Sequence, residues 1–141
     1  MKLINKDTDC AVRAILYIEK NSNRLVSTSL LNSEFNISRH YLRKILHILQ
    51  IKRILKSVKG VKGGFLLVRP ADKISLIDLV RIFQGEVNLN KCFFKKKICA
   101  NIKTCPLRKE VKNIERYVVN RLKAVTIAQL SKKSGEKRRK L

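Results

Sequence analysis

The chain has 141 residues, of which 33 are Lys or Arg and 10 are Asp or Glu, so its formal net charge is +23. This length fits one globular domain with its own core. No apolar run approaches the roughly 20 residues of a membrane-spanning helix, so we expect no membrane partner. The charge favours nucleic acid as a partner, although a lysine-rich proteome in an AT-rich organism would also raise the lysine content.

The first half of the chain predicts a winged helix-turn-helix. Apolar periodicity and short polar breaks indicate three helices, over residues 5–21, 27–35 and 39–51. Two β-prone runs then flank the glycine-rich segment 59–64, which is typical of a hairpin with a flexible tip, the wing. A further helix is predicted over residues 75–84. We therefore expect a mainly α fold with a small β-wing and a DNA-binding module at residues 1–84.

The third predicted helix carries most of the candidate DNA-binding side chains. One of its faces is apolar and predicts a packed core, whereas the remaining surface is cationic. We expect Arg39, His40, Arg43 and His47 to face base edges and three lysines to contact phosphates. The complete predicted set, including the turn and the wing, is Ser38, Arg39, His40, Arg43, Lys44, His47, Lys59 and Lys62.

The second half contains a cysteine-rich loop and a long helix. The loop, residues 85–106, holds Cys92, Cys99 and Cys105, and a helix is predicted over residues 107–130 after Pro106. The basic tail, residues 131–141, is expected to be disordered. One apolar stripe of the long helix predicts an interface with a partner. The residues of this stripe are Leu107, Val111, Ile114, Val118, Leu122 and Val125.

The three loop cysteines permit more than one chemistry. The polar start of the chain does not resemble a secretory signal, so we expect a cytoplasmic protein with thiols rather than disulfides. Converging thiolates on a flexible loop hold Fe–S clusters. A zinc site is poorly served, because no closely spaced second pair and no histidine lie nearby. Neighbouring lysines would favour thiolates, or they are simply solvated. The spacing alone supports a cluster and unmetallated thiols equally.

Several short stretches, taken together in their order and spacing, resemble the Rrf2 family of bacterial winged-helix transcription regulators, which includes iron–sulfur-biogenesis and nitric-oxide-sensing repressors. The stretches are residues 11–18, 37–38, 41–46, 59–65, 74–76, 105–107 and 125–130. The resemblance implies a homodimer whose long C-terminal helices cross. It also implies that two winged-helix modules read the halves of a near-palindromic double-stranded DNA operator, under the control of a labile [2Fe–2S] or [4Fe–4S] cluster.

The resemblance also implies which residues ligate the cluster. The three loop cysteines supply three thiolates, but the histidine ligand of the iron–sulfur-biogenesis regulators is replaced by Arg108, which does not ligate iron. The nitric-oxide-sensing relatives recruit an aspartate from the first helix of the other subunit, and Asp9 matches that position. The alternatives are Asp7 and Cys10. Asp9 could also be only a helix-start carboxylate that pairs with Arg13.

The resemblance is weaker at the wing. The family's wing usually begins with an arginine that enters the minor groove, and this chain has Lys59 there. Lysine keeps the charge but lacks the planar fork, so we expect weaker readout of a narrow minor groove.

These features predict a DNA-binding regulator, first of all a repressor, that senses iron, redox state or nitric oxide through its cluster. A regulator whose thiols react without metal is the alternative in the same class. A small basic RNA-binding protein is an alternative from another class, which the wing glycines and the long apolar stripe disfavour. An iron–sulfur carrier is a further alternative, but a carrier has no use for a helix-turn-helix or for such a positive charge. No catalytic motif is present, so we predict no enzyme.

Overall fold

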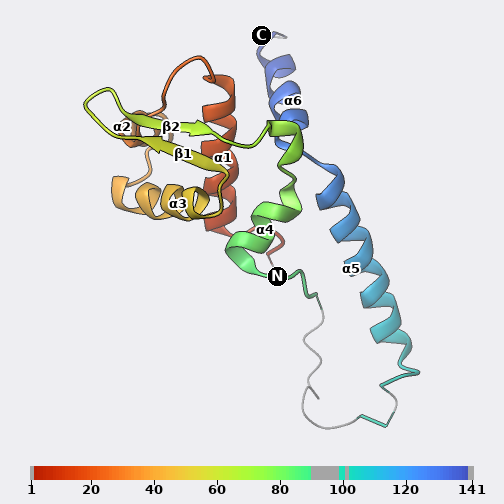
Figure 1. Ribbon diagram of the computed structural model, residues 1–141. Helices are drawn as coiled ribbons and strands as arrows, with labels where there is room; N and C mark the ends of the chain where they lie inside the picture. Colours follow the sequence, from red (N-terminus) through yellow and green to blue (C-terminus); the bar gives the residue numbers. More distant parts are fainter. Residues whose placement is uncertain (1, 90–98, 101, 140–141) are drawn as a thin grey trace.

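The structure is a computed structural model that describes residues 2–89, 99–100 and 102–139, with side chains up to residue 135 (Figure 1). Its helices are α1 (Lys6–Lys20), α2 (Thr28–Phe35), α3 (Arg39–Ile51), η1 (Ala71–Lys73), α4 (Leu76–Gln84), α5 (Pro106–Ala124) and α6 (Ile127–Arg139), and its strands are β1 (Leu55–Val58) and β2 (Gly64–Leu67). The predicted fold class, mainly α with a small β-wing, is confirmed.

Local capping sets the boundaries of the helix-turn-helix. The side chains of Asn5, Ser27 and Ser38 accept hydrogen bonds from backbone N–H groups in the first turns of α1, α2 and α3. Asn36 ends α2 in the left-handed conformation with φ of 51°, which asparagine tolerates better than most residues. The three helices therefore lie where the sequence predicts them, because a single polar N-cap side chain marks the start of each one.

The wing is an antiparallel hairpin in which Leu55 pairs with Leu67 at the open end. Val26, between α1 and α2, adds a short third edge: its N–H donates to the Phe65 carbonyl at 3.1 Å, and the Phe65 N–H donates to the Val26 carbonyl at 2.8 Å. A Cβ atom at Gly64 would lie 2.7 Å from the Val26 carbonyl oxygen, so glycine is needed there. The sequence analysis did not predict the contribution of Val26.

The main core lies between α1, α3 and the wing. Its central side chains are fully buried and follow helical spacing on α1 and α3. They are Ala11, Ala14, Ile15 and Ile18 of α1 and Leu42, Ile45, Leu46 and Leu49 of α3, with Val26, Leu31, Ile54, Leu55, Ile74, Leu79 and Ile127 around them. This core orients α3 and the wing as one unit.

The C-terminal part differs from the sequence expectation, which placed one helix over residues 107–130 and disorder after it. The chain leaves helical geometry at Val125, whose carbonyl accepts from the Leu76 N–H at 2.9 Å, and Ile127 donates to the Ile74 carbonyl at 2.9 Å. Ile127 is fully buried, and Thr126 caps α6 through its hydroxyl, which accepts from the Gln129 N–H. α6 then continues to Arg139, through most of the tail that was expected to be disordered.

The arrangement of the elements separates two parts (Figure 1). α3 and the wing lie on the side of the molecule away from α5, and α5 runs from Pro106 at its far end back to the body of the molecule. α6 returns alongside α1. None of the helices in the described part combines the length and apolarity that crossing a bilayer requires.

Candidate DNA interface and cysteine segment

The predicted DNA-binding side chains are all accessible to solvent. All eight of them are exposed, and α3 holds five of these on the face opposite to its core residues. No Asp or Glu occurs within α3, so nothing on the helix itself offsets its positive charge. Lys59 and Lys62 lie at the wing tip, on either side of the fully exposed Val61. A basic helix face beside a basic hairpin tip suits the phosphate backbone of DNA.

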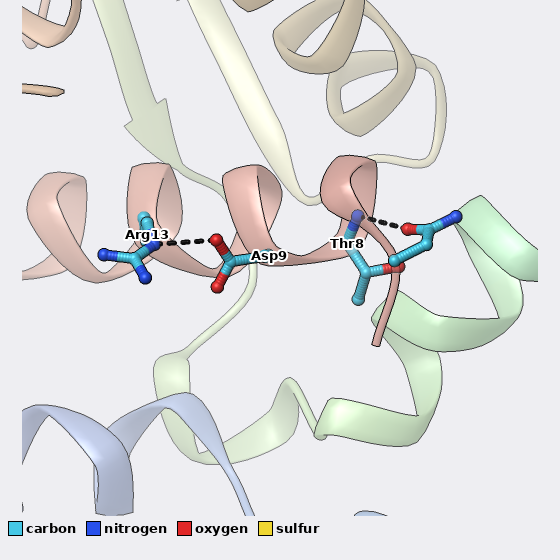
Figure 2. A network of polar contacts seen from close by, with 4 residues as sticks. Thr8, Asp9 and Arg13 are labelled. Atoms are coloured by element: carbon cyan, nitrogen blue, oxygen red, sulfur yellow. Dashed lines mark hydrogen bonds and ion pairs between the residues drawn. The ribbon is translucent and has the colours of Figure 1, made fainter. Parts of the chain in front are cut away.

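Asp9, the predicted fourth ligand, lies on the solvent-facing side of α1. Its Oδ2 atom is 2.9 Å from Nε of Arg13, and the two side chains are 54% and 59% exposed (Figure 2). The structure therefore contains the helix-start ion pair that the sequence analysis kept as an alternative role for Asp9. Pairs of this exposure contribute only about 0.3–0.5 kcal/mol, so the carboxylate is available to a stronger partner at little cost.

The two alternative ligands on α1 are engaged within the chain. Cys10 is only 3% exposed and belongs to the main core. Burial and the neighbouring Asp9 and Asp7 carboxylates raise the pKa of its thiol, which favours the neutral form. Asp7 accepts a hydrogen bond of 2.5 Å from the Tyr41 hydroxyl on α3.

Of the three loop cysteines, Cys92 lies outside the described residues, whereas Cys99 and Cys105 are free thiols of intermediate exposure. The Cys99 carbonyl accepts from the Ile102 N–H at 3.0 Å, which closes a turn. Cys105 directly precedes Pro106 at the start of α5, and its side chain makes no capping hydrogen bond. Its thiol is therefore not committed to holding the helix end.

A shallow depression of about 620 Å³ surrounds Cys105, and four of its lining residues are basic. These are Lys103, Arg108, Lys109 and Lys112. Arg108, at the position of the histidine in related regulators, donates from Nη1 to the Ile102 carbonyl at 3.2 Å and so stabilises the segment. Thiols beside several cations suit an anionic Fe–S cluster. Within the described residues, however, no group of three His, Cys, Asp or Glu side chains is placed to hold a metal.

The first turn of α1 makes contacts that the sequence analysis missed. Thr8 is completely buried, and its hydroxyl donates to Oε1 of Gln84 at 2.8 Å. The same oxygen accepts from the Asn5 N–H at 2.8 Å, and Nε2 of Gln84 donates to the Leu3 carbonyl. Gln84 is the last residue of α4, so the start of α1 is fixed to the start of the cysteine segment. The sequence signal for these contacts was Thr8, a polar residue at a core position of α1 that needs a hydrogen-bond partner when it is buried.

Part of the predicted dimer stripe on α5 packs within the chain, and part of it is exposed. Leu122 is buried inside the chain against Ile77 and Val80 of α4, and Val118 packs beside it. Val111 and Val125 are partly buried. In contrast, Leu107 is 70% and Ile114 54% exposed, and Tyr117 is 67% exposed on the same helix. The open apolar surface therefore lies in the N-terminal half of α5.

Residues 4–133 match the model of the Rrf2 family, described as an iron-dependent transcriptional regulator. The chain is 30% identical over 98 residues to the HTH-type transcriptional regulator NsrR of Bacillus licheniformis, covering 69% of this chain and 68% of that protein. Its fold is similar to CymR, the global cysteine regulator of B. subtilis (TM-score 0.79, 21% identity, 94% and 98% of the chains), and to T. potens IscR (0.73, 20%, 95% and 88%). The chain thus belongs to the Rrf2 family of DNA-binding transcriptional regulators and is not an enzyme.

Proposed function

We propose that the chain is a dimeric repressor whose operator affinity depends on a labile Fe–S cluster, held by Cys92, Cys99 and Cys105 of one subunit and Asp9 of the other. The observation that carries this proposal is the uncommitted Cys105 thiol in a basic depression at the start of α5. The iron-dependent character of the matched family supports it.

The DNA-binding part of the proposal rests on α3 and the wing. Arg39, His40, Arg43 and His47 are exposed on one helix, which supports a role in contacting base edges in a major groove. Lys44, Lys59 and Lys62 contribute phosphate contacts on either side. A near-palindromic operator follows if two such modules are joined by a twofold axis, because each module then reads one half-site.

The dimer part rests on the open surface of α5. Leu107, Ile114 and Tyr117 expose a large apolar area on one helix, and no other described element of the chain covers it. Val118 and Leu122 pack against α4 at the other end of the helix, so α5 is attached to the body of the chain while its open half meets the partner. A second copy of α5 is the occupant that a symmetric regulator provides.

The residues around the thiols and Asp9 have separate roles in this account. A bound Fe–S cluster supplies a group whose integrity depends on iron supply, oxidants and nitric oxide. Lys103, Lys109 and Lys112 place positive charge around the depression, beside the anionic cluster. Asp9, whose side chain forms an exposed ion pair with Arg13, supplies the ligand that joins one subunit to the other. Joining the subunits there sets the spacing of the two modules.

A metal-free thiol regulator is the second candidate. The observation in its favour is that Cys99 and Cys105 are both free and partly accessible within one short segment, where oxidation of one thiol is readily followed by reaction with another. The similarity in fold to CymR, named as a global cysteine regulator, is consistent with this alternative.

Anaerobic purification distinguishes the two candidates. We expect a coloured protein with iron and acid-labile sulfide, and loss of the colour after Cys105→Ser. Asp9→Ala should lower cluster yield or its lifetime in air, whereas Asp72→Ala, at an exposed position on η1, should leave both unchanged. A colourless, iron-free protein that binds its DNA only with reduced thiols would refute the cluster and favour the second candidate.

A further inference from the structure

The recognition helix is joined to the first turn of α1 by one polar side chain, Tyr41. Tyr41 lies in the first turn of α3, between the exposed His40 and Arg43. Its hydroxyl donates to Oδ1 of Asp7 at 2.5 Å, and the Lys6 ammonium lies 5.0 Å from the centre of its ring. Buried apolar side chains of the two helices also pack together in the main core. Apolar contact is non-directional, whereas the hydrogen bond of Tyr41 fixes a donor against a particular acceptor.

The same turn of α1 is a junction for the proposed sensor. Asp9 follows Asp7 by two residues and is the proposed ligand to the partner's cluster. Thr8, between them, is hydrogen-bonded to Gln84 at the end of α4, where the cysteine segment begins. A displacement of this turn would therefore act on two other elements of the chain: on α4 through Thr8 and on α3 through Asp7.

We propose that the Tyr41–Asp7 hydrogen bond transmits the state of the ligand at Asp9 to α3, so that Tyr41 is a positioning residue that couples cluster ligation to operator affinity. This inference rests on the proposed function and assigns a route to its regulation. Coupling requires contacts that differ between two states, and a bond that fixes the first turn of α3 to the ligand-bearing turn provides such a contact.

The chemistry of the pair suits this role. A hydrogen bond to a carboxylate is shorter and stronger than one between neutral groups, so it passes on small displacements. Partial burial and the Asp7 carboxylate raise the pKa of the Tyr41 hydroxyl, because both disfavour the charged phenolate. Lys6 over the ring holds the aromatic side chain in place whether or not the hydroxyl is present.

Tyr41→Phe tests the proposal, because it removes the hydroxyl and keeps the ring. A duplex selected from a random-sequence library with the wild-type protein serves as the probe, and its dissociation constant is measured anaerobically for the cluster-loaded and the iron-free full chain. We expect the ratio of the two constants to fall by roughly fivefold or more in Tyr41→Phe, with iron content and the salt dependence of binding as in the wild type. Asp7→Asn, which keeps an acceptor without the charge, should give an intermediate ratio.

Tyr17→Phe is the matched control, since Tyr17 lies on α1, the helix of Asp7, and packs edge-on against Phe35. This variant should leave the ratio unchanged. Equal weakening of both states by Tyr41→Phe would show a purely structural role and overturn the inference, as would an unchanged ratio. A wild-type ratio of one would instead overturn the proposed function and this inference together.

Discussion

The winged-helix module and the C-terminal arm, which is helix α5, differ in how they bury their apolar side chains. In the module, the apolar stripes of α1 and α3 meet each other and are fully buried within one chain. In the arm, only Leu122 of the α5 stripe is buried, while Leu107 and Ile114 remain exposed. Similar amphipathic patterns therefore have different outcomes, since one pattern finds its partner in the same chain and the other does not.

The largest expected difference between the two regions concerns stability. Ile45→Ala removes a fully buried side chain from the module, and we expect it to lower the free energy of unfolding by about 2–4 kcal/mol. Urea denaturation followed by circular dichroism measures this loss. Ile51→Ala, at the 62% exposed end of α3, is the control and should cost less than about 0.5 kcal/mol. Equal losses in the two variants would contradict the core described above.

Substitutions in the open surface of the arm should weaken dimer formation without unfolding the chain. Ile114→Lys places a charge in the open apolar surface of α5, so we expect the dimer dissociation constant to rise at least about tenfold. Sedimentation equilibrium measures this constant, and Asn120→Lys, at another exposed position of the same helix, should leave it nearly unchanged. A dimer that tolerates Ile114→Lys would place the interface elsewhere.

This contrast explains what the sequence predicted and what it missed. The bounds of α3 follow from Ser38 and the apolar stripe, because both signals are local. The end of α5 was missed because Val125 and Ile127 pair with residues 74–76, which are distant in sequence. The capping pattern of Thr126 and Gln129 was a local signal that went unused.

In the candidate site, too, features set by nearby residues were predictable from the sequence, whereas contacts between distant residues were not. The exposed basic face of α3 agrees with its periodicity, and the Asp9–Arg13 pair follows from a spacing of four residues. The Tyr41–Asp7 and Thr8–Gln84 contacts join residues far apart in the sequence, so no local pattern indicates them. Ligation by Asp9 of the partner subunit involves a second chain and stays a prediction.

The two regions should also differ in how much a single arginine contributes to DNA binding. We expect Arg43→Ala, on the exposed face of α3, to weaken binding to the selected duplex by about 1–3 kcal/mol. Arg121→Ala removes the same charge from α5 and should change binding only slightly. Fluorescence anisotropy at fixed salt compares the two variants. A larger effect at Arg121 would move the DNA interface to the arm.

A smaller effect is expected from pH, through Tyr41. The pKa of its hydroxyl is raised above the ordinary value of 10.0, so the folded chain holds this proton more tightly than the unfolded chain. The resulting stability is fully present below about pH 10 and is lost as the pH rises further. Tyr41→Phe should cost about 1–2 kcal/mol at neutral pH and show a flatter decline above pH 10. Parallel pH profiles of unfolding in the two proteins would contradict this assignment.

The most direct test of the account compares operator binding by the anaerobically purified protein before and after its iron is removed with a chelator. We expect the iron-loaded dimer and the iron-free dimer to bind the same selected duplex with clearly different dissociation constants, and Cys105→Ser to behave like the iron-free form throughout. Equal affinity before and after iron removal, in a protein that is dimeric and folded in both states, would contradict control of the winged-helix module by a cluster in the cysteine segment.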